Sequence, residues 1–461
     1  VLRRETPIVV PNRIPREGTS MKYALTHATL LDGTPDMQPQ HDMTVLVDER
    51  GLIASVGPTA TTEVPAGTAE IDLAGKYLLP GLINMHVHFC GSGKPMSSSG
   101  AADLIDKVTG NPLGRAYMRH EVQKSAETEL LSGVTTVRGV GDPVWADIQT
   151  RDAVNAGKYR GPRMLCSGWG VTPVNGHGRG LIAKTCETDE DARALVRDLF
   201  AHKADLVKLF ITGGVFDAEK PGEPGIVRMS LEMASATVDE AHKLGLATAT
   251  HVESADGVKL ALEAGVDTIE HGAHMTPEII ELFHHNGVGL SSSLTTTISP
   301  AIPLARMDRE KTHSSEVVKL NADVVFRGIV DASKQALEAG IPVGLGTDSG
   351  CPYITHYDFW RELVYFHDLV GASTTLTLHT ATLGNARLLH VDDVTGSIEP
   401  GKSADLIVVA GNPLDNLDVL RHVEQVMMAG RLITHPTAKH LRELDADLDE
   451  ILHIKLDEDA S

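Results

Sequence analysis

The chain has 461 residues, of which 42% are hydrophobic, so it can bury a large core and form one large domain with a smaller one beside it. Its 62 acidic residues outnumber the 41 basic ones and give a formal charge of -21, and no lysine and arginine cluster is present to contact phosphates, which argues against a nucleic-acid partner. No run of about 18 apolar residues occurs, which argues against a membrane span.

Residues 1–20 form a predicted N-terminal extension, in which four arginines lie among prolines without the apolar core of a signal peptide. The four cysteines are far apart and match neither a disulfide framework nor a metal knuckle. We therefore expect a cytoplasmic protein. These arginines and cysteines are Arg3, Arg4, Arg13, Arg16, Cys90, Cys166, Cys186 and Cys351.

Both flanks of the chain are predicted to be rich in β-structure. In five stretches apolar and polar residues alternate between turns of Gly, Pro and Asp, which is typical of β-hairpins. We expect residues 21–80 and 391–434 to pair into one small β-sandwich domain. The five stretches are Tyr23–Gly33, Met43–Val56, Ala69–Leu79, Gly396–Asn412 and Val423–Ile433.

Residues 81–390 alternate short apolar strands with amphipathic stretches of helical period, as in βα units around a parallel sheet. Helix starts are indicated by hydroxyl caps at Ser230, Ser254 and Thr276. Eight such units in roughly 300 residues fit a closed barrel. The predicted fold class is therefore α/β, a (β/α)8 TIM-type barrel with the small β-sandwich built from both flanks. The eight predicted strands are Leu82–Phe89, Val134–Val140, Arg163–Gly168, Leu206–Ile211, Ala247–Val252, Thr268–Glu270, Val288–Ser292 and Val343–Thr347.

The last segment, residues 435–461, is predicted to be a C-terminal helix. Within His435–Leu456 four apolar residues share one helical face and acidic residues occupy the other. We favour docking of this face on its own chain over an oligomer contact, which leaves a homo-oligomer open. The four residues are Leu441, Leu444, Leu448 and Ile451.

Residues of the type that bind metal ions occupy five predicted strand ends, where active sites of such barrels lie. His86 and His88 stand two apart on the first strand, so period-two geometry points both imidazoles to the same side, as chelation requires. The fourth, fifth, sixth and eighth strands end in Lys208, His251, His271 and Asp348, in that order.

Each of these residues has a structural explanation when it is taken alone. The lysine could be ion-paired, either single histidine could be hydrogen-bonded in the barrel, and the aspartate could cap the following helix. Coincidence does not explain why all of them occupy the correct strand ends together. The pattern therefore indicates a metal-binding site at this end of the barrel.

The sequence resembles the amidohydrolase superfamily, in the branch of imidazolonepropionases, Xaa-Pro dipeptidases (prolidases) and related metallo-carboxypeptidases. The resemblance extends from about Met21 to Ile433. It includes Lys76-Tyr-Leu-Leu-Pro-Gly-Leu-Ile-Asn before the first histidine pair and Gly396-Ser-Ile-Glu-Pro-Gly-Lys-Ser-Ala-Asp-Leu-Ile-Val after the barrel.

This resemblance implies two divalent metal ions, for which we expect zinc. One ion would be more buried than the other, and a carbamate formed on the lysine would bridge them, because an ammonium group is no metal ligand. In that scheme His86, His88 and Asp348 hold the inner ion, His251 and His271 hold the outer one, and carboxylated Lys208 lies between them.

The prolidase-like branch also implies residues that contact the substrate. His177, in the loop after the third strand, matches a histidine that polarises the scissile carbonyl. Where the prolidases have a tyrosine that binds the substrate carboxylate, this chain has Met229, with Arg228 beside it. Either Arg228 binds a free carboxylate, or Met229 and Phe216 form an apolar wall for a neutral substrate.

The leading function is hydrolysis of an amide or peptide C–N bond by a metal-bridging hydroxide, with Asp348 as the proton carrier. The substrate would be a small-molecule amide or dipeptide, and the enzyme a prolidase-like dipeptidase or carboxypeptidase, or an N-acyl amino acid hydrolase. A mononuclear cyclic amidohydrolase of the imidazolonepropionase type is an alternative, against which Lys208 weighs. A non-catalytic scaffold of the same fold is a further alternative, against which the complete set of six ligand-type residues weighs.

Overall fold

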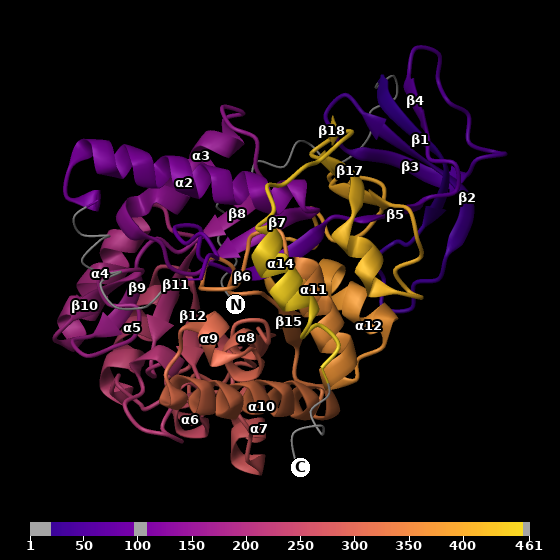
Figure 1. Cartoon of the computed structure of the whole chain (residues 1–461). Helices are drawn as coiled ribbons and strands as arrows, with labels where there is room; N and C mark the ends of the chain where they lie inside the picture. The colour runs from indigo at the N-terminus through magenta and orange to yellow at the C-terminus, as the bar shows by residue number, and fades with distance from the viewer. Residues whose placement is uncertain (1–19, 96–107, 455–461) are drawn as a thin grey trace.

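The structure is a computed structural model that describes residues 20–95 and 108–454. Residues 1–19 of the predicted N-terminal extension, and residues 455–461 of the predicted C-terminal helix, lie outside this part of the chain. A barrel of strands surrounded by helices and a β-rich unit lie side by side, with the β-rich unit at the upper right of Figure 1.

Eight parallel strands form the barrel, as the sequence predicts. Three of them pair in one sheet and five in another, and backbone hydrogen bonds join the two sheets at both edges. At one edge the N–H of Asp348 donates to the carbonyl of His86 at 2.9 Å, and at the other the N–H of Asp205 donates to the carbonyl of Cys166 at 2.8 Å. The short strands β9 (Gly170–Pro173) and β10 (Ala183–Cys186) extend one rim. The barrel strands are β6 (Leu82–Val87), β7 (Val134–Gly139), β8 (Arg163–Cys166), β11 (Leu206–Phe210), β12 (Ala247–Val252), β13 (Thr268–His271), β14 (Ser293–Thr296) and β15 (Val343–Leu345).

Helices surround the strands and bury their outer faces. Ser230, Ser254 and Thr276 each accept a backbone N–H at a helix start, as predicted. The helices are α2 (Pro112–Leu131), α3 (Ala146–Asn155), α4 (Asp189–Ala201), α5 (Leu231–Lys243), α6 (Ala255–Glu263), α7 (Pro277–His284), α8 (Ala301–Arg306), α9 (Arg309–Thr312), α10 (Glu316–Glu338), α11 (Phe359–Tyr365), α12 (Thr374–His379) and α13 (Asn385–Leu388), with the short turns η1 (Pro143–Trp145), η2 (Val215–Asp217), η3 (Phe366–Val370), η4 (Thr380–Gly384) and η5 (Leu417–Arg421).

The seventh strand was predicted at Val288–Ser292, and this prediction is wrong, because the strand is β14 (Ser293–Thr296). The side chain of Asn286 accepts the backbone N–H groups of Val288 and Leu290 and holds the predicted stretch in a tight turn. Val288 and Leu290 are consequently exposed, at 50% and 38%.

Strands from both flanks form a single eight-stranded sheet around a second hydrophobic core, which is the predicted β-sandwich. The expected hairpin at Ala69–Leu79 is absent, because β4 and β5 both pair with β1 in the parallel direction. The strands are β1 (Met21–Leu30), β2 (Gln40–Asp48), β3 (Ile53–Pro58), β4 (Ala69–Asp72), β5 (Tyr77–Pro80), β16 (Leu406–Val409), β17 (Val423–Met428) and β18 (Arg431–Ile433).

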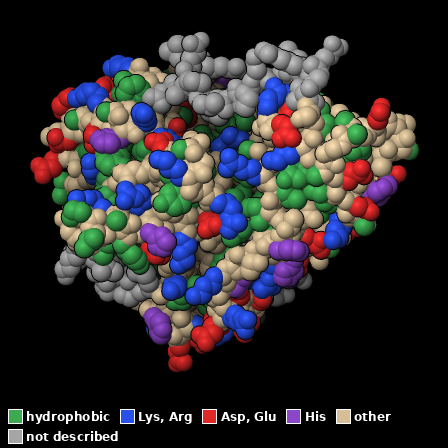
Figure 2. All heavy atoms as spheres, turned by 90° about the horizontal axis from the view of Figure 1, so that it is seen from above, with side chains coloured by type: hydrophobic (Ala, Val, Ile, Leu, Met, Phe, Trp, Pro, Cys, Tyr) green, Lys and Arg blue, Asp and Glu red, His purple; other side chains and the backbone are tan. Residues whose placement is uncertain are grey.

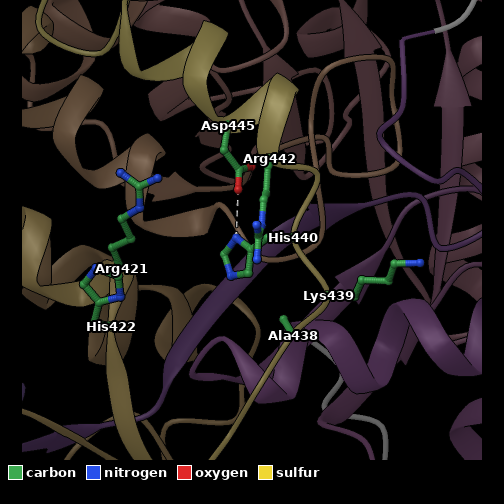
Figure 3. A pocket seen from close by; sticks show the side chains of 7 residues that line it. All are labelled: Arg421, His422, Ala438, Lys439, His440, Arg442 and Asp445. Carbon is green, nitrogen blue, oxygen red and sulfur yellow. Dashed lines mark hydrogen bonds and ion pairs between the residues drawn. The ribbon is translucent and has the colours of Figure 1, made fainter.

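The C-terminal helix is shorter than predicted and spans α14 (Arg442–Asp449). Its residues Leu444 and Leu448 are buried in the barrel's core, so the helix docks on its own chain. A surface cavity of about 510 Å³ lies beside it, and in Figure 3 the ring of His440 points at the carboxylate of Asp445, to which it is bonded at 2.9 Å. Arg421, His422, Ala438, Lys439 and Arg442 complete its lining, which includes none of the predicted site residues.

The surface carries both signs of charge in spite of the net charge of -21. On the face shown in Figure 2, many lysine and arginine side chains lie among the acidic ones. No helix within residues 20–95 and 108–454 is long and apolar enough to cross a membrane.

A buried ion pair joins the barrel to the β-sandwich. Arg163 of β8 contacts Asp405 at 2.9 Å, and the Asp405 side chain is fully buried and also accepts the backbone N–H of Ala429 at 2.8 Å. We expect Asp405→Ala to lower the free energy of unfolding by about 3 kcal/mol, because it leaves the arginine without its anion. Urea unfolding followed by circular dichroism measures this change.

The matched control is Glu127→Ala, which removes the partner of Arg160 in an ion pair whose side chains are 53% and 38% exposed. Its cost should stay below about 1 kcal/mol. Equal losses of stability in both variants would contradict a special role for the buried pair.

Candidate metal centre

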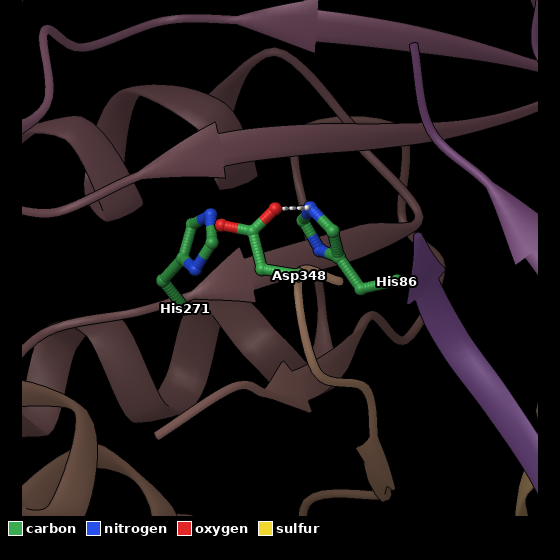
Figure 4. Close-up of side chains that lie close together, drawn as sticks. All are labelled: His86, His271 and Asp348. Atoms are coloured by element: carbon green, nitrogen blue, oxygen red, sulfur yellow. Dashed lines mark ion pairs between the residues drawn. The ribbon is translucent and has the colours of Figure 1, made fainter. Parts of the chain in front are cut away.

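The centre lies where the barrel strands end, and Asp348 occupies its middle. Figure 4 shows the Asp348 carboxylate between the rings of His86 and His271, and the ligand atoms of these three residues all lie within 4.8 Å of one another. His86 comes from β6, His271 ends β13, and Asp348 follows β15. The barrel thus brings together three residues that are separated by up to 262 positions in sequence.

His86 and His88 face the same side, as the period-two argument predicts. Their Nε2 atoms lie 3.4 and 3.2 Å from Oδ1 of Asp348. Nδ1–H of His88 donates to the carbonyl of Gly141 at 2.8 Å, which fixes the tautomer and leaves Nε2 free to bind a metal ion.

A second buried carboxylate orients His86. Nδ1–H of His86 donates to Glu270 at 2.8 Å, and Arg138 of β7 donates to the other oxygen of Glu270 at 2.6 Å. Although burial opposes its ionisation, the charge of Arg138 and the bond to His86 lower the pKa of Glu270 to about 2. An anionic Glu270 therefore holds the ring of His86 with its Nε2 directed at Asp348.

His251 and His271 form the opposite side of the centre, with ring centroids 4.7 Å apart. His271 Nδ1 shares a hydrogen bond of 2.6 Å with Thr297, and Nε2–H of His251 donates to the carbonyl of Gly213 at 3.3 Å. Each ring keeps one nitrogen free. His271 has a φ of +66° and Asp348 one of +62°, a left-handed conformation that non-glycine residues adopt mainly at functional positions.

Lys208 lies in the middle of β11, not at its end as predicted from the sequence, and it is fully buried. Its Nζ atom has no hydrogen-bond partner within the described part of the chain, an arrangement that is costly for an ammonium group. Burial lowers its pKa to about 8, although the carboxylates of Glu270 and Asp348 oppose this shift. No hydrogen bond within the described chain stabilises this amine, so a covalently added group or a bound ligand would have to supply its partners.

Burial also sets the protonation of the remaining groups. It lowers the pKa of His88, and it places the pKa values of His251 and His271 well below the ordinary value, so these rings are neutral, as metal ligands must be. Asp348 has a pKa well below its usual range, because the contacts with His86 and His88 outweigh the effect of burial. Neutral imidazoles beside a carboxylate are a donor set that fits divalent ions.

His177 lies in the loop between β9 and β10, as predicted, and its ring stacks on that of His251 at 4.4 Å. Nδ1–H of His177 donates to Asp217 in η2. This bond and the charge of Asp217 raise the pKa of His177 against the effect of burial. His177 therefore lies next to the cluster as an oriented donor.

Arg228 and Met229 lie in different environments. Arg228 is exposed and lies close to Gly213 and Asp217. A Cβ added to Gly213 would lie 3.8 Å from Nε of Arg228 and 3.5 Å from Cβ of Asp217. Met229 is only 1% exposed and packs in the barrel core, so it offers little surface to a substrate. Phe216 is 38% exposed.

Glu253, a further carboxyl group that the sequence pattern does not single out, lies just beyond β12. Burial raises its pKa to about 8, with His177 opposing and Asp217 and Asp348 adding to the shift. Glu270 and Asp217 are likewise not among the site residues predicted from the sequence. The sequence signals that could have found two of these carboxylates are their distances from strand-end histidines. Glu253 follows His251 by two residues, and Glu270 directly precedes His271.

Comparisons with known proteins agree with this geometry. A model of the amidohydrolase family matches residues 77–433. The structure of a candidate prolidase from Bifidobacterium longum is 38% identical, with a TM-score of 0.83 over 93% of this chain and 98% of that one. A Xaa-Pro dipeptidase structure with methionine in its active site is 29% identical, with a TM-score of 0.77 over 90% and 100% of the two chains.

Curated relatives are more distant. Ochratoxinase from Aspergillus niger is 24% identical over 444 residues, 87% of this chain and 85% of that one. Imidazolonepropionase from Nocardia farcinica is 26% identical over 389 residues, 79% and 84% of the two chains. The chain belongs to the amidohydrolase family, and the resemblance drawn from its sequence is confirmed.

We expect Glu270→Gln to weaken metal binding about 10- to 100-fold, because a neutral amide holds His86 less firmly and leaves Arg138 unpaired. Competition with a chelator for Zn²⁺ measures the affinity. The control is Asp48→Asn, which removes a fully buried carboxylate that pairs with Arg50 in the β-sandwich. Similar losses of affinity in both variants would show a general loss of structure instead.

Proposed function

We propose that the protein hydrolyses the C–N bond of a small amide or dipeptide with the help of two divalent metal ions, in the manner of a prolidase-like dipeptidase or carboxypeptidase or an N-acyl amino acid hydrolase. The observation that carries this proposal is the convergence of the predicted ligand residues on one buried centre. The prolidase structures among the similar proteins support the substrate class.

Two ions are favoured over one because of Lys208. Its buried amine has no partner in the described chain, and carboxylation by carbon dioxide would convert it into an anion with two oxygens that can bridge a metal pair. His86, His88 and Asp348 would hold the inner ion, and His251 and His271 the outer one. Zinc suits these nitrogen and oxygen donors.

The residues of the chain then have separate tasks in the reaction. Bound divalent ions supply Lewis acidity, which activates water and polarises the amide carbonyl. His177, held by Asp217, donates a hydrogen bond to the carbonyl oxygen as negative charge develops there. Asp348 takes the proton of the attacking water and delivers it to the leaving nitrogen.

The two alternatives differ in the number of ions. A mononuclear amidohydrolase like imidazolonepropionase would bind one ion per chain, and a non-catalytic scaffold would bind none. The orphaned amine of Lys208 disfavours the first, and the complete set of donors disfavours the second. Elemental analysis of the purified protein together with a screen of dipeptides and N-acyl amino acids tests the proposal, and two ions with C–N hydrolysis is the expected result.

We expect Lys208→Ala to lose at least about 100-fold in kcat/KM, because the metal pair loses its bridge, and propionate to restore part of the activity by bridging the ions. The control is Lys184→Ala, which removes a partly exposed lysine from the rim strand β10 and should keep its activity. Full activity of Lys208→Ala would contradict the binuclear centre.

Arg228 leads to a prediction about the other end of the substrate. If its guanidinium binds a free carboxylate, a Xaa-Pro dipeptide should exceed its C-terminal amide in kcat/KM by about 10- to 100-fold, and Arg228→Gln should remove the difference. Arg193→Gln on α4, where Arg193 pairs with Asp239 at 2.8 Å, is the control. Equal kcat/KM values for the dipeptide and its amide in the wild type would favour a general amidase.

A further inference from the structure

Glu253 stands directly after β12, the strand that carries His251, and belongs to none of the groups assigned so far. It follows β12 two residues after His251, so its side chain extends from the same side of the chain, one step further out. The backbone is held firmly, because the N–H of Glu253 donates to Thr212 at 3.1 Å. The loop at Gly225 passes so close that a Cβ there would lie 2.6 Å from the carbonyl of Glu253.

The carboxyl group of Glu253 is incompletely satisfied. Its Oε2 atom is buried and has no hydrogen-bond partner among the described residues. The backbone N–H of Val215 donates to this carboxyl group, and the charges of His177, Asp217 and Asp348 act on it. A carboxylate oxygen without a partner can accept a further hydrogen bond, and a cationic donor makes the stronger kind of bond.

We propose that Glu253 binds the free α-amino group of the substrate's N-terminal residue, so that the enzyme acts on dipeptides with a free amino terminus in preference to N-acyl amino acids. This inference rests on the proposed function and narrows its substrate class.

The position of Glu253 fits this task. The α-amino group is separated from the scissile carbonyl by a single carbon, so a group that binds it must lie beside the groups that act on the carbonyl. Glu253 meets this requirement, because it follows His251 by two residues and the ring of His251 stacks on that of His177 at 4.4 Å. An N-acyl amino acid without that amine would place carbon against the unsatisfied oxygen and leave it without a partner.

The test compares Ala-Pro with propanoyl-proline, which has the same carbon skeleton and lacks only the amine, as substrates of the Zn²⁺-loaded protein. We expect the wild type to prefer Ala-Pro by about 10- to 100-fold in kcat/KM, as a charged hydrogen bond would provide. In Glu253→Gln this preference should disappear because kcat/KM for Ala-Pro falls, whereas kcat/KM for propanoyl-proline should stay within about threefold of the wild-type value. That retained activity also shows that the variant is folded.

Glu219→Gln, which changes an exposed carboxylate in the loop between β11 and α5, is the matched control and should keep the wild-type preference. Equal kcat/KM of the wild type on both compounds would overturn the inference and leave the proposed function intact. An equal loss on both compounds in Glu253→Gln would also overturn it, because the residue would then act in the chemistry. Cleavage of neither compound by the wild type would contradict the proposed function and this inference together.

Discussion

Arg138 and Glu270 form an ion pair in the centre of the barrel, where their side chains are 5% and 0% exposed. Removing one partner of such a pair typically costs about 3–5 kcal/mol, because the other charge remains buried. The pair also fixes the anion against which His86 is oriented. Through His86 the anion also affects the centre itself, because Nε2 of that ring lies 3.4 Å from the carboxylate of Asp348.

Much of the centre is legible in the sequence because two regularities of parallel sheets are local. Side chains alternate along a strand, which pairs His86 with His88, and all strands of a barrel end at the same rim, which brings Lys208 and His251 towards them. The carboxylates around them escape this logic. Glu270 and His271 are neighbours that alternation would send to opposite faces, and the left-handed backbone of His271 lets both reach the centre.

The error at the seventh strand has the opposite origin. Val288 and Leu290 have the side chains of a buried strand, but the turn at Asn286 exposes them, and the true strand β14 is made of serine and threonine with one leucine. Two of those hydroxyls have distant partners: Thr295 accepts from Arg138 at 3.1 Å, and Thr296 shares a bond of 2.8 Å with Ser333 on α10. A polar strand of this kind depends on partners that are distant in sequence, so hydropathy does not indicate it.

The pairing of β5 with β16 has a consequence for synthesis on the ribosome. Strands β1 to β5 leave the ribosome first, whereas their partner β16 begins only at Leu406. At ~5–20 residues per second the early strands wait on the order of half a minute with an unpaired edge, and such edges promote aggregation of nascent chains. The barrel between them can fold in that interval, so closure of the sheet by the C-terminal strands is a late step of folding, in which the two flanks of the chain meet.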